Sequence, residues 1–221
     1  TNIGNFVADV MRKALKTDVA VINSGTLRAD TVIEKGPFKM RDLVSLLPML
    51  DELCILQISG ENLLSVLENS VSQYPRLEGR FAQVSGVTFT FDAAKPSGAR
   101  LLRETIKLSG MPLDLGRNYK LCTKDYLRQG KDGYDVFRDL ICLADGEQAG
   151  ILPTVVRDSF QEISQLNGTT ENCPHHSTQN AEKVLGELSL ERVGDGPDLM
   201  KSYAIAPKVE GRIICLNPVA C

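Results

Sequence analysis

Residues 19–30, VAVINSGTLRAD, join a short apolar run to a polar loop. The run from Val19 to Ile22 is rich in β-branched residues and is typical of a buried β-strand. The loop that follows contains Asn23 and Arg28, and loops at strand ends often carry binding residues. A plain turn is the alternative, in which the Asn and Gly supply permissive backbone angles and the arginine is a solvated charge. The stretch alone leaves both interpretations open.

The sequence on either side predicts alternating helices and strands. Residues 2–16 place apolar side chains at helical spacing behind Thr1 or Asn2 as a cap: Ile3, Phe6, Val7, Val10, Met11 and Ala14. After the loop, MRDLVSLLP predicts a short helix that stops at Pro48. LCILQIS (53–59) then predicts a strand, and GENLLSVLENSVSQY (60–74) predicts an amphipathic helix.

Strands dominate the next part of the chain. A polar turn, LEGRFAQVSG (77–86), leads into VTFTFD (87–92), whose alternation of apolar residues and threonine suits a half-buried strand. LLRETIKLSG (101–110) and YKLCTKDYL (119–127) predict two more strands, and SGMPLD supplies the turn between them. The order predicts an α+β fold in which mixed β-sheets pack with helices in layers, rather than repeated βαβ units.

Beyond about Leu143 the pattern changes. Residues 151–166, ILPTVVRDSFQEISQL, predict a helix packed on the domain. Residues 167–181 contain almost nothing apolar and predict a flexible polar loop, and EGRIICLNP near the end predicts a final strand. We therefore expect a domain over 1–166, a loop over 167–181, and an extension over 182–221 that returns to the domain. No role for the extension follows from its residues.

Composition excludes several classes of function. The chain has 221 residues, of which 43% are hydrophobic and 24% charged, and its formal net charge is −3. Because lysine and arginine are scattered without a basic run, we expect no nucleic-acid partner. No stretch approaches the roughly 20 apolar residues of a membrane span, so none is expected. The chain begins without methionine or a signal-like segment and looks like part, or a processed product, of something longer.

Cysteine and histidine do not form a recognisable metal site. The six cysteines include no C-x-x-C pair, and Cys54 and Cys122 fall in predicted strands, where a free thiol acts as a small hydrophobe. The two histidines, His175 and His176, are adjacent in the polar loop, where solvation is the commoner role. Free thiols weakly favour a cytoplasmic location, but the N-glycosylation sequon at Asn167 argues against it, so the compartment stays open.

Motifs for catalysis are also missing. We find no G-x-S-x-G, P-loop, G-x-G-x-x-G or H-E-x-x-H segment. A dimetal centre needs several converging carboxylate and imidazole ligands, which two loop histidines do not provide. We expect this chain alone to hold no catalytic machinery, metal ion or cofactor.

Five segments occur in order over about the first 140 residues: TNIGNFVADVM, INSGTLRAD, VSLLPMLDELCILQISGENLLSVLE, GRFAQVSGVTFTFD and YLRQGKDGYD. Together they resemble the C-terminal domain of the 5'-nucleotidase family of metallophosphoesterases. The resemblance implies a nucleoside- or nucleotide-binding domain. It also implies a partner, a preceding calcineurin-like domain of the same protein that binds two divalent metal ions and performs the hydrolysis.

The resemblance implies roles for individual residues. Asn23 matches a position that contacts the nucleobase, and Arg28 matches one that engages the ribose or phosphates. Asp132, in GKDG, matches an aspartate that accepts hydrogen bonds from the ribose hydroxyls, which suits a carboxylate facing a vicinal diol. Gly79 matches a glycine that lets the backbone approach the ligand. No metal ligand and no catalytic residue is implied within this chain.

Two aromatic rings sandwich the base in the family, and this chain departs from that pattern. The matching positions are Met49 and Tyr126, so only one aromatic face is kept. Other departures are Asn-Ser-Gly-Thr-Leu-Arg in place of Asn-Gly-Gly-Gly-Ile-Arg, and Lys131 in place of a glycine. Two alternatives therefore stay open. One is a phosphoesterase for a cyclic nucleotide, dinucleotide or sugar phosphate, and the other is a non-catalytic binding module.

Overall fold

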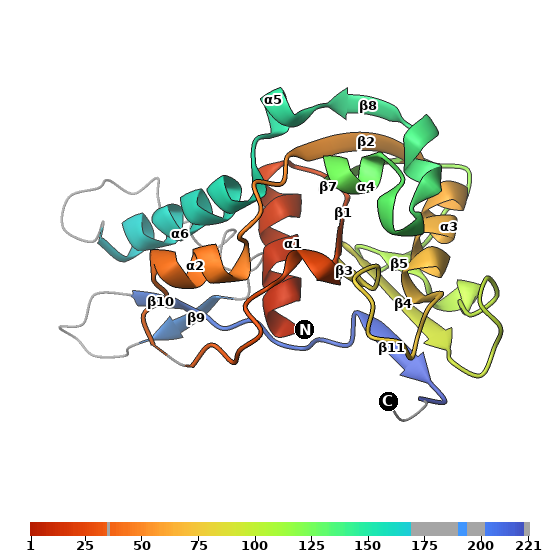
Figure 1. Cartoon of the computed structure of the whole chain (residues 1–221), viewed down its shortest axis with the longest axis horizontal. Coiled ribbons are helices and arrows are strands. Elements are labelled where there is room, and N and C mark those ends of the chain that lie inside the picture. The colour runs from red at the N-terminus through yellow and green to blue at the C-terminus, as the bar shows by residue number, and fades with distance from the viewer. Residues whose placement is uncertain (35, 169–189, 194–201, 219–221) are drawn as a thin grey trace.

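The computed structural model describes all residues except 35, 169–189, 194–201 and 219–221 (Figure 1). Its helices are α1 (Asn2–Ala14), α2 (Met40–Leu46), α3 (Gly60–Val71), α4 (Asp125–Arg128), α5 (Gly146–Ala149) and α6 (Leu152–Gly168), with 3-10 turns η1 (Ser24–Thr26), η2 (Arg103–Thr105), η3 (Lys131–Gly133) and η4 (Asp135–Asp139). Its strands are β1 (Val19–Asn23), β2 (Leu53–Ser59), β3 (Ala82–Ser85), β4 (Val87–Asp92), β5 (Lys107–Leu108), β6 (Met111–Pro112), β7 (Asn118–Lys124), β8 (Ile141–Ala144), β9 (Leu190–Val193), β10 (Ser202–Ile205) and β11 (Ile213–Leu216).

A five-stranded mixed sheet forms the centre of the molecule. Its strand order is β3-β1-β7-β2-β8. β1 and β7 are parallel, whereas β3 pairs antiparallel with β1, and β2 pairs antiparallel with both β7 and β8. A second sheet has the order β11-β4-β5-β6. The mixed sheets and their helices confirm the predicted α+β fold.

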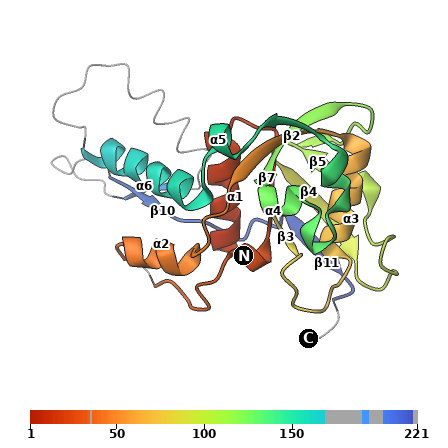
Figure 2. The ribbon, with the colours of Figure 1, turned by 45° about the horizontal axis from the view of Figure 1, so that its top comes forward.

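β1 is buried along its whole length because apolar layers cover both faces of the sheet. Val19 and Val21 pack into one core with α3 and the second sheet. Ala20 and Ile22 point to the opposite face and pack into another core with α1, α2 and α6. Figures 1 and 2 show α1, α2 and α6 on one side and α3 with β4 and β11 on the other. Two covered faces explain the unbroken apolar run that precedes Asn23.

The predicted helices are present, and their ends have local causes. α1 begins after Thr1, whose side chain accepts a hydrogen bond from the amide of Gly4. α2 ends at Leu46, just before Pro48. α3 is capped by Ser59, which accepts from the amide of Asn62. Among the described residues, no helix has the length and hydropathy needed to cross a membrane.

Three local predictions were wrong. The expected polar turn over 77–86 contains strand β3, and the expected strand over 119–127 ends at Lys124 and continues as helix α4. Within the strand expected over 101–110, Arg103–Thr105 form the turn η2, Lys107–Leu108 form β5, and Leu101 makes a single bridge to Phe91. There the Thr105 hydroxyl donates to the carbonyl of Leu102 and accepts from the amide of Thr90, so a side chain replaces ladder contacts.

The C-terminal part of the chain contacts α1 and the second sheet. β11, which lies within the predicted final strand, pairs in parallel with β4. Just before it, Arg212 forms two hydrogen bonds of 2.7 Å with the carboxylate of Asp9 on α1. α6 extends to Gly168, two residues past the expected end of the domain. Residues 169–181 of the predicted loop, including both histidines, lie outside the described residues.

Candidate functional site

The sheet topology brings several loops together at one edge of the central sheet. Because β1 and β7 are parallel neighbours, their carboxyl ends lie at the same edge. β2 runs antiparallel to β7, so its first residues start there, and Leu53 pairs with Lys124. β3 runs antiparallel to β1, and Ala82 pairs with Asn23. All six residues that the resemblance indicates belong to segments that reach this edge.

Asp132 is the centre of this edge, and both oxygens of its side chain are engaged. The amide nitrogen of Asn23 donates to Oδ2 over 2.7 Å. The hydroxyl of Tyr126 donates to Oδ1 over 3.0 Å. The Asn23 side chain is buried, and its own Oδ1 accepts from the hydroxyl of Thr26 over 2.7 Å. Asn23 thus holds Asp132 in place in this structure, whereas the resemblance implies that it contacts the base.

The loop that carries Asp132 has an unusual backbone. Asp132 has φ +55° and ψ 24°, in the left-handed region, which aspartate tolerates better than most residues. Gly130 and Gly133 on either side also have positive φ, 78° and 77°. From α3, the side-chain amide of Asn69 donates to the carbonyl of Asp132 over 3.1 Å. Asn69 therefore supports the loop from behind, a role that nothing in the sequence indicated.

Gly79 lies against the turn after β1. The amide of Gly25 donates to the carbonyl of Gly79 over 3.0 Å. A Cβ on Gly79 would lie 3.3 Å from the Cα of Gly25 and 3.7 Å from Oδ2 of Asp132. A side chain on Gly79 would therefore be tight against Gly25 and would make ordinary van der Waals contact with Asp132. The resemblance implies a different role, a close approach of this backbone to the ligand.

Tyr126 is partly exposed, and its surroundings keep its hydroxyl protonated. Its side chain is 41% exposed. Desolvation first, and then the hydrogen bond to Asp132 and the negative charge there, raise the pKa of the phenol above its usual value. The positive charge of Arg28 acts on the same phenol in the opposite direction. Arg28 is exposed and fixed through its backbone amide, which donates to the carbonyl of Leu46 over 2.9 Å.

A buried ion pair lies under the Tyr126 ring and was not predicted. Lys124 is 5% exposed, and its ammonium lies 2.8 Å from Oδ2 of Asp51. The same ammonium lies 5.0 Å from the centroid of the Tyr126 ring. Asp51 comes two residues after Met49, which is 59% exposed. The only signal in the sequence was a lysine within the strand expected over 119–127.

The predicted residues thus differ in how closely the structure joins them. Asn23, Tyr126 and Asp132 are in direct contact, and Gly79 lies beside them. Arg28 is linked to Tyr126 through its charge. Met49 precedes Asp51 by two residues, and Asp51 binds Lys124 at this edge. Within the described part of the chain, no group of three His, Cys, Asp or Glu side chains could hold a metal ion.

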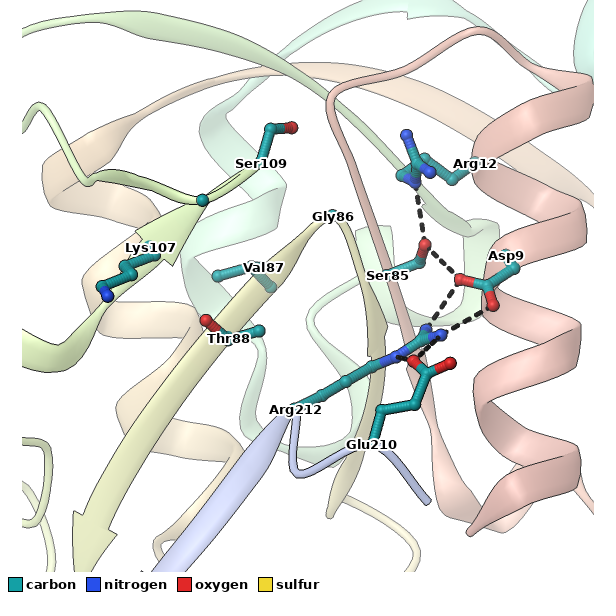
Figure 3. Close-up of a pocket in the computed structure, with 11 residues that line it drawn as sticks. Asp9, Arg12, Ser85, Gly86, Val87, Thr88, Lys107, Ser109, Glu210 and Arg212 are labelled. Carbon is teal, nitrogen blue, oxygen red and sulfur yellow. Dashed lines mark hydrogen bonds and ion pairs between the residues drawn. The ribbon is translucent and has the colours of Figure 1, made fainter. Parts of the chain in front are cut away.

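A hollow of about 340 Å³ lies near the opposite end of β1 and β3 from the Asp132 site (Figure 3). Five of its polar side chains form one network: Asp9, Arg12, Ser85, Glu210 and Arg212. The Ser85 hydroxyl donates to Asp9 over 2.6 Å and accepts from Nε of Arg12 over 2.8 Å, and Arg212 also binds Glu210. Ser85 pairs with Ala20 at the start of β1, whereas the Asp132 site lies at its end. This network fastens the C-terminal segment to α1 and the sheet.

Comparisons with known proteins agree with this architecture. Residues 1–139 match the family described as "5'-nucleotidase, C-terminal domain". A crystal structure of a 5'-nucleotidase precursor from Thermus thermophilus superposes with a TM-score of 0.71 and 26% identity, covering 99% of this chain and 36% of that one. A snake venom 5'-nucleotidase from Macrovipera lebetinus is 26% identical over 98% of this chain and 47% of its own.

A trifunctional nucleotide phosphoesterase protein, YfkN, from Bacillus subtilis is 29% identical over 68% of this chain and 10% of its own length. This chain therefore spans less than half of the length of these two curated relatives. The family match covers more than half of this chain, and the structural likeness extends over nearly all of it. The chain belongs to the family of 5'-nucleotidase C-terminal domains.

Proposed function

We propose that this chain binds the nucleoside part of a nucleotide whose phosphoester bond is hydrolysed by a preceding domain of the same protein. The observation that carries the proposal is the carboxylate of Asp132, held at the sheet edge between Asn23 and Tyr126. Family membership supports it, because relatives carry the names of 5'-nucleotidases and of a nucleotide phosphoesterase.

Asp132 has the chemistry required to bind a ribose. An ionised carboxylate accepts hydrogen bonds only, and a vicinal diol can offer one from each hydroxyl. Asn23 anchors Oδ2 from a buried position, whereas Oδ1 faces the partly exposed phenol of Tyr126. A ribose would therefore compete with Tyr126 for Oδ1. Exchanging one donor for another lets the site open without leaving the carboxylate unpaired.

The base and the phosphate have candidate partners on either side of Asp132. The Tyr126 ring presents an aromatic face on which a base can stack, with Met49 as the proposed opposing contact. Arg28 is exposed, and its guanidinium offers several donors to anionic oxygens. The sulfur of a methionine is polarizable but flexible, so we propose weaker and less selective base binding than a clamp of two rings would give.

The hydrolytic step is proposed to take place outside this chain. The resemblance assigns two divalent metal ions to the preceding domain, where they would activate water and polarise the phosphoryl group. The residues described here would orient the nucleoside towards that centre. We accordingly propose that this chain alone does not hydrolyse nucleotides.

A second candidate function is hydrolysis of more than one type of nucleotide ester. The Bacillus subtilis relative is named a trifunctional nucleotide phosphoesterase, which favours this candidate over a sugar phosphate substrate. A cyclic nucleotide that blocks the ribose diol would lose contacts with Asp132 and depend more on Tyr126 and Arg28. Assays of the full-length protein on AMP, 2',3'-cyclic AMP and ribose 5-phosphate would distinguish the candidates.

Titration calorimetry tests the proposed function directly. Adenosine, 2'-deoxyadenosine and ribose 5-phosphate are titrated into the full-length protein. We expect adenosine to bind more tightly than 2'-deoxyadenosine, because loss of one hydroxyl removes one hydrogen bond to Asp132. Equal affinities would contradict recognition of the diol. A parallel assay of the purified 221-residue chain with added Mn²⁺ should show no phosphate release from AMP.

A further inference from the structure

The ion pair beneath Tyr126 connects the two walls proposed to contact the base. Lys124 is the last residue of β7 and precedes Tyr126 by two positions, whereas Asp51 follows Met49 by two positions. Their side chains meet at 2.8 Å, with only 6% and 15% of the side-chain surfaces exposed. A backbone hydrogen bond of 2.9 Å from Asp125 to Glu52 lies beside the pair. The two segments are therefore fastened together directly under the site.

The same ammonium contacts the Tyr126 ring. Its distance of 5.0 Å from the ring centroid is within the range of a cation–π interaction. A buried ion pair adds little stability compared with apolar side chains of similar volume, but it constrains the direction of both partners. One face of the ring is occupied by the cation, which leaves the other face for a ligand.

We propose that Lys124, held by Asp51, is a positioning residue that sets the orientation of the Tyr126 ring and its separation from Met49. That the ligand is a nucleobase rests on the proposed function. That Lys124 sets the orientation of the Tyr126 ring is a statement about the free protein. A ribose alone meets the carboxylate of Asp132 and competes there with the Tyr126 hydroxyl, but it makes no contact with the face of the ring. Breaking the pair should therefore weaken binding of a base much more than binding of a ribose alone.

The first experiment needs no ligand. The full-length protein is labelled with 3-fluorotyrosine, and the fluorine resonance of Tyr126 is identified by its loss in Tyr126→Phe. We expect Lys124→Met to broaden or split this resonance as the ring samples several orientations, and Lys124→Arg to restore a single line. Lys120→Met is the matched control, because Lys120 lies exposed on the same strand. An unchanged resonance in Lys124→Met would overturn the inference.

The second experiment measures selectivity by calorimetry with adenosine and ribose 5-phosphate. We expect Lys124→Met to weaken adenosine binding by up to about thirtyfold, because the lost cation–π contact can orient the ring by at most about 2 kcal/mol, and we expect ribose 5-phosphate binding not to weaken. Equal weakening of both ligands would show a merely structural role and overturn the inference. If Lys124→Met does not fold, Lys124→Met/Asp51→Asn removes both charges together and must show the same selectivity. A parent protein that binds neither ligand would refute the proposed function, while the fluorine spectra still decide the positioning role.

Discussion

The side-chain nitrogen of Asn23 lies 2.7 Å from Oδ2 of Asp132, although 109 residues separate them in the sequence. A buried amide thus fixes the orientation of a carboxylate whose other oxygen contacts a partly exposed phenol. We expect Asp132→Asn to weaken adenosine binding by about 1.5 to 3 kcal/mol, because hydrogen bonds to a charged acceptor are lost. Titration calorimetry on the full-length protein measures this change.

Asp135→Asn is the matched control for this variant. Asp135 lies three residues further along and forms an exposed ion pair of 3.0 Å with Arg138. We expect its substitution to leave adenosine affinity unchanged and to alter stability by less than about 1 kcal/mol. If both variants lost the same affinity, the effect would come from the loop rather than from the carboxylate of Asp132.

Tyr126 affects adenosine binding in two opposing ways: its ring offers a stacking surface, and its hydroxyl competes for Asp132. Two substitutions can separate these effects. Tyr126→Phe keeps the ring and removes the hydroxyl that occupies Oδ1 of Asp132. We expect adenosine to bind more tightly by about 0.5 to 1.5 kcal/mol, because the diol no longer competes with the phenol. Tyr126→Ala also removes the stacking surface and should weaken binding by about 1 to 3 kcal/mol. Weaker binding in Tyr126→Phe would mean that the hydroxyl itself contacts the ligand.

The sequence predicted the helices and strands around this site better than the contacts between them. The spacing of apolar residues and the capping residues located α1, α2, β2 and α3, because both signals lie within each element. Asn23 and Asp132 were indicated by family motifs. Their mutual hydrogen bond was not, because it depends on β1 and β7 being neighbours, which no local pattern encodes. Lys124 and Asn69 were missed for the same reason, since each contacts a segment far away in the sequence.

The strand prediction over 101–110 was wrong because of a polar side chain. LLRETIKL alternates in a way that suits a strand, but the Thr105 hydroxyl bonds to backbone groups of Leu102 and Thr90 and favours a turn. β3 was missed because AQVS is short and follows a charged turn. Its burial comes from pairing with β1 and from contact with α1, which are tertiary effects.

Arg212 should contribute strongly to stability. Its guanidinium binds both oxygens of Asp9 at 2.7 Å and the carbonyl of Val84 at 2.9 Å, with the Arg212 and Asp9 side chains only 12% and 6% exposed. We expect Arg212→Met to lower the free energy of unfolding by about 3 to 5 kcal/mol, since the buried Asp9 loses its charged partner and keeps only the Ser85 hydroxyl. The control Arg157→Met breaks an exposed pair with Asp158 and should cost less than about 1 kcal/mol. Urea unfolding of both variants would refute this role for Arg212 if the two losses were equal.

Two buried thiols should be unreactive in the folded chain. Burial raises the pKa of Cys54 and of Cys122 from 9.0 to about 12. At pH 8 the thiolate fraction of each is about one in ten thousand, so iodoacetamide should modify the half-buried Cys142 and Cys215 before Cys54 and Cys122. Mass spectrometry after native and urea treatment checks the order. Rapid native labelling of Cys54 would contradict its place in the core.

The raised thiol pKa values also predict how stability depends on pH. The folded state retains protons on Cys54 and Cys122 that the unfolded state releases above pH 9.0. Their contribution to stability is complete below pH 9.0 and is lost as the pH rises towards about 12. A Cys54→Ala/Cys122→Ala variant should therefore lose less stability than the parent between about pH 9 and about pH 11. The free energy of unfolding of both proteins is measured by urea titration at each pH. If it fell equally with pH in parent and variant, this linkage would be contradicted.

Met49 offers a gain-of-affinity test of the proposed base contact. Met49 and Met40 are both 59% exposed, but Met49 precedes β2 at the site edge whereas Met40 begins α2. We expect Met49→Phe to tighten adenosine binding by about 0.5 to 1.5 kcal/mol, because an aromatic ring gives a larger and less flexible stacking surface than a thioether. Met40→Phe adds the same ring elsewhere and should change nothing. Ribose 5-phosphate affinity should be equal in both variants, since neither ring is proposed to contact the diol. If Met49→Phe leaves adenosine binding unchanged while Tyr126→Ala abolishes it, the base stacks on Tyr126 alone and Met49 is not its second wall.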